Sequence, residues 1–190
     1  MDHQTKARFS ILTNPIITEG NACLETPPQI YQKIESDFGP FTLDLTADQD
    51  RYLLPQWFGP GSPLGEPDAL LAHWSHYGTS GYSNPPYGPF VPQILKKAKA
   101  EAKVGFVSTF LLPVRMTRAF HHHVLCGASE LWFCDKRITF WENGAPKLTL
   151  TKKGTYEITS ALFDSMIVRY APGQRFSPPR VGSWKVPPHV

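Results

Sequence analysis

The middle of the chain alternates between helical and strand patterns of apolar residues. Over 90–103, apolar side chains recur every three or four positions and lysines occupy the opposite face, which predicts an amphipathic helix. An almost unbroken apolar run follows over 104–112 and stops at Pro113, as in a buried strand. A second helix is predicted over 117–126, ended by a glycine, and a strand over 130–140. Strands and helices therefore alternate in this part of the sequence.

The flanking sequence predicts shorter elements. A helix over 29–37 is expected to start with Thr26 as its N-cap, because proline follows at the favoured first helical position, and to end at Gly39-Pro40. Segment 49–80 is rich in turn formers. The remaining predicted elements are a strand over 41–45, a helical turn or two over 68–74, a hairpin over 147–158 around Lys152-Lys153-Gly154, and a last strand over 162–170.

This order of elements predicts an α/β fold with a doubly wound, mostly parallel sheet. The two late strands have no long helix between them, so an antiparallel edge is expected. In such sheets ligands bind beyond the carboxyl ends of the strands. The expected organisation is an N-terminal extension over 1–24, one domain over 25–170, and a basic, proline-rich C-terminal tail over 171–190.

Composition and charge add a candidate partner. The chain has 190 residues, of which 41% are hydrophobic and 18% charged, with a net charge of +3. These values suit one globular domain. No acidic residue follows Asp164, whereas four basic residues do: Arg169, Arg175, Arg180 and Lys185. This basic tail is expected either to follow a phosphate backbone or simply to keep the terminus soluble.

Three cysteines without a framework spacing indicate reduced thiols. The sequence shows no leader pattern and no apolar run long enough to span a bilayer. These features favour a soluble intracellular protein.

The most specific motif is Asn84-Pro85-Pro86-Tyr87. Two consecutive prolines exclude a central strand, so a turn between a short strand and the helix over 90–103 is expected. An exocyclic amino nitrogen is a poor nucleophile because its lone pair is delocalised into the ring. The Asn84 oxygen and the Pro85 carbonyl can accept its two N–H hydrogens, and the Tyr87 ring offers a surface for stacking. The prolines add no competing donor. The motif therefore indicates methyl transfer to an amino nitrogen, in which alignment matters more than a strong base.

From about Thr26 to Tyr170 the chain resembles the phage-type DNA N6-adenine methyltransferases, the Dam-like family. The motif, together with Gly88, resembles the catalytic turn of that family. Other resembling segments follow in the expected order: Thr26-Pro27-Pro28, 41–47, 68–71 with Trp74, 111–115, Phe120-His121 and 137–140. The resemblance implies a Rossmann-like, S-adenosylmethionine-dependent enzyme. It further implies methylation of N6 of adenine in double-stranded DNA, with the target base flipped out of the duplex.

The resemblance also implies roles for individual residues. Catalysis would involve Asn84, Pro85, Pro86 and Tyr87. S-adenosylmethionine would contact Thr26, Pro27, Asp44, Thr46, Ala47 and Asn84. Substrate would contact Tyr87, Arg115 and Arg137. Most enzymes of this fold carry Gly-x-Gly after the first strand, whereas this chain has Asp44-Leu45-Thr46-Ala47-Asp48 there. A monomer or weak dimer in the cytoplasm of a bacterium or phage-infected cell is expected.

Several alternatives stay open at this point. The same turn serves methylation of RNA or of protein glutamine, and a chain without Gly-x-Gly could be a non-catalytic nucleic-acid-binding module. Arg115 could form a surface salt bridge instead of contacting substrate. No metal site is expected at His121-His122-His123, because adjacent helical side chains diverge by about 100°. Gly59-Pro60-Gly61 is interpreted as a plain turn, and the lysines of the helix over 90–103 as a solvated face.

Overall fold

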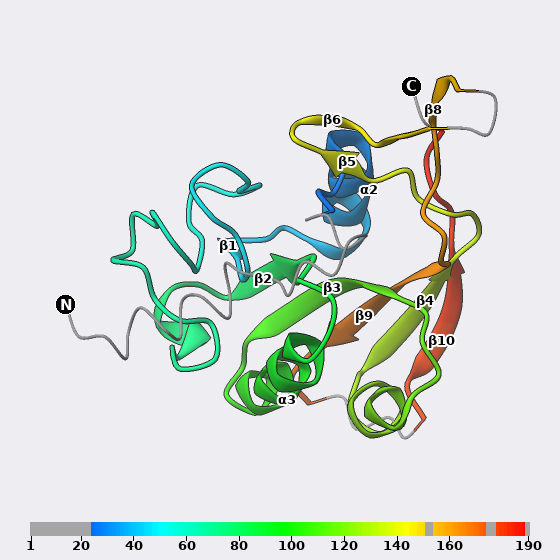
Figure 1. Cartoon of the computed structure of the whole chain (residues 1–190). Helices are drawn as coiled ribbons and strands as arrows, with labels where there is room; N and C mark the ends of the chain where they lie inside the picture. Colours follow the sequence, from blue (N-terminus) through cyan, green and yellow to red (C-terminus); the bar gives the residue numbers. More distant parts are fainter. Residues whose placement is uncertain (1–23, 151–153, 174–177, 189–190) are drawn as a thin grey trace.

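Figure 1 shows a computed structural model that describes residues 24–150, 154–173 and 178–188. The extension over 1–23, Lys152, Lys153 and Arg175 therefore lie outside the described residues. The elements are, in chain order, α2 (Pro28–Phe38), β1 (Leu43–Asp44), the 3-10 helix η1 (Trp74–His76), β2 (Ser80–Ser83), α3 (Phe90–Lys103), β3 (Val107–Pro113), the π-helix η2 (Phe120–Leu125), β4 (Glu130–Cys134), β5 (Trp141–Glu142), β6 (Ala145–Pro146), β7 (Leu148–Leu150), β8 (Tyr156–Ile158), β9 (Ser165–Tyr170) and β10 (Arg180–Trp184).

The central feature is a mainly parallel sheet in the order β1-β2-β3-β9-β4-β10. Neighbours β1 and β2, β2 and β3, and β4 and β10 pair in parallel, whereas β9 is antiparallel to both β3 and β4. The predicted α/β class with a mostly parallel sheet is confirmed. The predicted antiparallel edge is wrong, because the antiparallel strand lies inside the sheet.

The position of β9 follows from the path of the chain. After β4 the chain forms β5 to β8 beyond the carboxyl end of that strand (Figure 1). It re-enters the sheet from the same end, so β9 runs in the opposite direction to its neighbours. The chain then turns and adds β10 beside β4, in register from Arg180↔Glu130 to Trp184↔Cys134. Residues 180–184, predicted to belong to a tail, are therefore an edge strand of the sheet.

Two apolar layers cover the two faces of the sheet. Alternate residues of β3 point to opposite faces, as a strand requires: Phe110 and Leu112 pack with α3 and η2, and Leu111 packs with α2. Met166 and Ile167 of β9 divide between the faces in the same way. Helices on both faces leave the ends of the strands free to form a site.

The start of α2 differs from the prediction. Pro27, not Thr26, is the N-cap, and no side chain caps the helix. The Thr26 hydroxyl instead hydrogen-bonds the Tyr82 hydroxyl at 2.8 Å, both residues being buried. Gly39 ends the helix as predicted.

Three further predictions need adjustment, and two are confirmed. The strand expected over 130–140 ends at Cys134, because the Asp135 carboxylate accepts a hydrogen bond from the Val186 N–H and the chain turns away. The helix expected over 117–126 is largely a π-helix. The strand expected over 41–45 pairs with β2 only at Leu43–Asp44. The bounds of α3 and the pairing of β7 with β8 are confirmed.

Candidate active site

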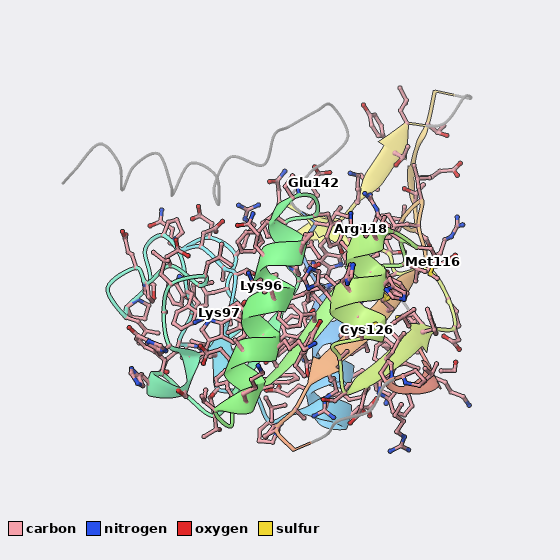
Figure 2. All side chains as sticks on the ribbon, turned by 90° about the horizontal axis from the view of Figure 1, so that it is seen from below. Lys96, Lys97, Met116, Arg118, Cys126 and Glu142 are labelled. Atoms are coloured by element: carbon pink, nitrogen blue, oxygen red, sulfur yellow. The ribbon has the colours of Figure 1, made fainter. Side chains whose placement is uncertain are left out.

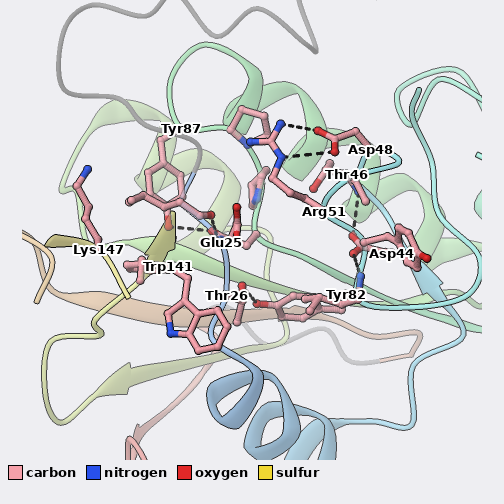
Figure 3. A pocket seen from close by; sticks show the side chains of 18 of the residues that line it. Glu25, Thr26, Asp44, Thr46, Asp48, Arg51, Tyr82, Tyr87, Trp141 and Lys147 are labelled. Atoms are coloured by element: carbon pink, nitrogen blue, oxygen red, sulfur yellow. Dashed lines mark hydrogen bonds and ion pairs between the residues drawn. The ribbon is translucent and has the colours of Figure 1, made fainter. Parts of the chain in front are cut away.

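A cavity of about 680 Å³ lies at the carboxyl ends of β1 and β2. Its walls come from the ends of these strands, the turn after β2, the loop over 45–60, and residues within 140–149 and 159–163. Figure 3 shows that the cavity has two sides, with Tyr87, Trp141 and Lys147 on one and Asp44 and Asp48 on the other. This volume is in the range of small-molecule sites, and the position is the one at which α/β sheets bind ligands.

The Asn84 side chain is held in one orientation at the cavity wall. Its Nδ2 donates a hydrogen bond of 2.7 Å to the Leu24 carbonyl oxygen. Its Oδ1 accepts a hydrogen bond of 2.9 Å from the Tyr87 hydroxyl. Because the amide nitrogen must face the carbonyl, the amide oxygen is presented on the side of Tyr87. A carbonyl oxygen has two lone pairs, so Oδ1 can accept one further hydrogen bond.

Tyr87 lies beside Asn84 with its ring against the late segment of the chain. The ring makes an edge-to-face contact with Phe163, with 5.6 Å between the centroids. Burial raises the pKa of the Tyr87 hydroxyl well above its ordinary value, although the positive charge of Arg115 acts in the opposite direction. The hydroxyl therefore stays protonated and donates to Asn84 at all physiological pH values.

Asp44 supplies a buried carboxylate on the other side of the cavity. It accepts hydrogen bonds from the backbone N–H groups of Thr46, at 3.3 Å, and Leu53, at 3.2 Å. Burial raises the pKa of Asp44 to about 6, against the opposing effect of these two hydrogen bonds. A pKa this high means that the two hydrogen bonds do not fully replace the hydration that the carboxylate loses on burial. A positive group placed beside Asp44 would therefore stabilise its charged form.

The loop after β1 returns to the strand and is held by backbone pairing. The Phe58 N–H donates to the Asp44 carbonyl, and the Ala47 N–H donates to the Phe58 carbonyl. Gly59 has φ +132°, and a Cβ at this position would lie 2.1 Å from the Ala47 carbonyl oxygen. Gly59 is thus required for the close approach that shapes the cavity wall at Thr46 and Ala47. The interpretation of Gly59-Pro60-Gly61 as a plain turn missed that Gly59 and Pro60 line the cavity.

Hydroxyl pairs join β2 to its surroundings beneath the cavity. The Thr46 and Ser83 hydroxyls lie 2.6 Å apart, which ties the loop after β1 to the end of β2. Thr26 is tied to Tyr82 in the same strand. These pairs hold the two sides of the cavity at a fixed separation.

Most of the predicted site residues line this cavity. Nine of the eleven do so: Thr26, Asp44, Thr46, Ala47, Asn84, Pro85, Pro86, Tyr87 and Arg115. No ion pair joins Arg115 to a carboxylate in the described part of the chain, so the surface salt bridge considered for it is not formed there. Pro27 caps α2 and does not line the cavity, and Arg137 lies outside it, where its Nε donates to Asp164 at 3.1 Å.

Several other lining residues have no recognisable signature in the sequence. Glu25 pairs with Trp141 through two backbone hydrogen bonds, of 2.9 and 3.0 Å, which bring the start of the domain against the late segment. Tyr52 stacks on Trp57 with 4.3 Å between the ring centroids. Neither contact has a local signature, because each depends on how distant or irregular segments meet.

Among the described residues, no three His, Cys, Asp or Glu side chains are grouped so as to hold a metal ion. None of the helices in the described ranges is long and apolar enough to cross a membrane.

Comparison with known proteins connects this geometry to a family. Residues 17–164, more than half of the chain, match the family model described as DNA N-6-adenine-methyltransferase (Dam). No curated protein matches the chain. The matched range includes the turn over 84–87, the end of β1 and the loop between them. The chain therefore belongs to the DNA N-6-adenine-methyltransferase (Dam) family and is an enzyme of adenine methylation in DNA.

Proposed function

We propose that this enzyme transfers a methyl group from S-adenosylmethionine to N6 of an adenine flipped out of double-stranded DNA into the cavity. The observation that carries the proposal is the fixed Asn84 amide, whose oxygen is presented beside Tyr87. Family membership supplies the reaction, and the two-sided cavity supports separate places for the base and the cofactor. The mainly parallel sheet with helices on both faces is compatible with a Rossmann-like methyltransferase fold.

On the side of Asn84, the turn can hold an adenine amino group by its two hydrogens. Asn84 Oδ1 has a free lone pair for one N–H, and the Pro85 carbonyl is the candidate acceptor for the other. Both contacts would favour a more tetrahedral nitrogen, which localises the lone pair on nitrogen in place of its delocalisation into the ring. Tyr87 keeps the amide oxygen in place and offers its ring to the base. The methylated nitrogen is acidic and loses its extra proton to water, so no strong base is required.

On the side of Asp44, the residues fit S-adenosylmethionine. When bound, this cofactor supplies an electrophilic methyl group on a positively charged sulfur. Asp44 is a buried carboxylate whose partners in the described part of the chain are two backbone N–H groups, and it suits a positively charged ligand. Thr26, Thr46 and Ala47 would complete the contact surface. The Thr46–Ala47 loop, supported by Gly59, takes the place of the usual Gly-x-Gly turn.

The test is methyl transfer from labelled S-adenosylmethionine to DNA, RNA and protein assayed side by side. Label is expected in N6-methyladenine of DNA. The Asn84→Ala variant should lose transfer but stay folded, with a modestly lower melting temperature because Leu24 and Tyr87 lose a hydrogen-bond partner. Asn143→Gly should retain activity, because Asn143 is exposed, does not itself line the cavity, and has a φ of +54° that glycine adopts easily. Label in RNA or protein but not in DNA would overturn the proposed acceptor. Absence of any S-adenosylmethionine binding, measured calorimetrically with and without DNA, would overturn the cofactor assignment.

A further inference from the structure

Positive charge is concentrated in one stretch of the sequence. Residues 90–129, which contain α3, β3 and η2, include six lysines and arginines and a single acidic residue, Glu101, for a net charge of +5. Because the whole chain carries +3, the remainder is net negative by two charges. The small net charge of the whole chain therefore hides an uneven distribution of charge along the sequence.

The lysines of α3 form an exposed stripe. Lys96, Lys99 and Lys103 follow at spacings of three and four residues, so they share one face of the helix and span about 10 Å along its axis. Lys97 is different, since its Nζ pairs with the buried Glu101 carboxylate at 2.7 Å. In the described ranges no ion pair joins the three exposed lysines to a carboxylate.

The segment around η2 continues this positive face. Figure 2 shows α3 and η2 next to each other, with Lys96 on the first and Arg118 and Cys126 at the two ends of the second. Lys99 Nζ donates a hydrogen bond of 3.0 Å to the Cys126 carbonyl, which ties the two helices together. Partial burial lowers the pKa of His123 on η2, and the positive charges nearby, including Lys96, lower it further.

This face begins at the candidate active site. Helix α3 starts three residues after Tyr87, which lines the cavity. Arg115, also in the cavity wall, precedes the exposed Arg118 by three residues at the carboxyl end of β3. A polyanion that enters the cavity with one nucleotide can therefore continue over α3 and η2.

Two of the C-terminal basic residues, Arg169 and Arg180, are less suited to this role. Arg169 is paired with Glu130 at 3.0 Å inside the sheet. Arg180 lies over the Trp132 ring, 5.5 Å from its centroid. Both guanidinium groups have partners within the fold, so phosphate contacts would have to compete with them.

We propose that Lys96, Lys99, Lys103 and Arg118, here called the α3–η2 basic surface, bind the phosphate backbone of DNA next to the flipped adenine. The proposal rests on the proposed function, since it assumes DNA in the cavity. The lysine stripe is about 10 Å long, which is enough to contact more than one successive phosphate of a DNA strand. Contacts of this kind fix the position of the protein on the duplex but do not distinguish one base sequence from another.

The experiment compares two double variants that each remove two positive charges. Lys96→Gln/Arg118→Gln removes two charges of the α3–η2 basic surface that form no ion pair with any residue the structure describes. Lys33→Gln/Arg180→Gln is the control on the face covered by α2, where Lys33 pairs with Asp37 and Arg180 lies over Trp132. DNA binding is measured by fluorescence anisotropy from 50 to 300 mM salt, with melting temperature and S-adenosylmethionine affinity determined for each protein.

The surface variant should lower the slope of log K against log salt by about 2 and weaken binding on the order of 50-fold at 0.1 M salt. Its melting temperature and cofactor affinity should equal those of the unmodified protein, and the control should keep the original slope. An unchanged slope in the surface variant, or an equal loss in the control, would overturn the α3–η2 assignment. If the unmodified enzyme fails to methylate DNA, the proposed function itself is wrong, which is a separate outcome.

Discussion

The Tyr87 hydroxyl donates a hydrogen bond of 2.9 Å to Asn84 Oδ1, the atom proposed to accept a hydrogen from the adenine amino group. Tyr87 thus has two separable functions, orientation of the amide through its hydroxyl and contact with a base through its ring. The Tyr87 ring also contacts the Phe163 ring, which connects the turn over 84–87 to the late segment of the cavity wall.

Replacement of Tyr87 by phenylalanine should separate these functions. Tyr87→Phe keeps the ring and loses a hydrogen bond worth about 1 kcal/mol, so single-turnover methylation should slow about fivefold while DNA affinity stays constant. Tyr87→Ala should reduce both rate and affinity, because stacking is worth about 1–3 kcal/mol. A Tyr87→Phe enzyme as fast as the unmodified one would show that Asn84 needs no support from the hydroxyl.

The affinity for S-adenosylmethionine should depend on pH through Asp44. Its pKa of about 6 in the free protein means that the carboxylate is largely protonated below pH 6 and charged above it. A cationic ligand prefers the charged form, so affinity should fall towards tenfold per pH unit below pH 6 and level off near pH 7. Calorimetric titration between pH 5 and 7 measures this. Asp44→Asn should bind weakly and without this pH dependence, and a pH-independent unmodified protein would contradict the assignment.

Gly59→Ala should destabilise the protein and impair cofactor binding. The added Cβ would meet the Ala47 carbonyl at 2.1 Å in a backbone conformation that disfavours side chains. Gly105→Ala is the matched control, with a φ of +104° but no atom within 4 Å of the added Cβ. Backbone strain of about 1–2 kcal/mol applies to both, and the clash adds about 1–3 kcal/mol only at Gly59. Thermal melts and cofactor titration of the two variants would test this difference, which equal melting temperatures would disprove.

The Thr26–Tyr82 hydroxyl pair should show coupling in a double-mutant cycle. Thr26→Val and Tyr82→Phe should each lower the free energy of unfolding by about 1–2 kcal/mol, since each leaves a buried hydroxyl without its partner. The double variant should lose less than the sum, because no unpaired hydroxyl remains. Urea denaturation of the four proteins gives the coupling energy. Strict additivity would mean that the hydroxyls do not interact in solution.

The elements that sequence predicted well are those specified by local pattern. Helix α3 has the bounds that its apolar period and its lysine-rich opposite face indicate. The turn over 84–87 could be located because two prolines exclude regular structure, and Asp44 because it ends an apolar strand. Proximity of these two segments followed from the rule that parallel strands end at the same edge.

What could not be predicted depends on long-range pairing. Nothing in the sequence of β9 shows that it lies between β3 and β4, since an apolar strand suits any interior position. Strand β10 is short, mostly exposed and begins with the basic residue Arg180, so its sequence resembles part of a tail. The same applies to the contact of Glu25 with Trp141, which joins positions far apart in the chain. Arg137 was assigned by order along the sequence, and its side chain lies with Asp164 outside the cavity.

The interior position of β9 has a consequence for synthesis of the protein. Until residues 165–170 leave the ribosome, β3 lacks its neighbour β9, and β4 has neither of its final neighbours, β9 and β10. The stretch that matches the family ends at residue 164, one residue before this strand. Pairings between such distant segments form slowly, and unpaired strands are prone to aggregate. A chain released at residue 164 would carry the whole catalytic turn yet lack the strand that joins the two parts of its sheet.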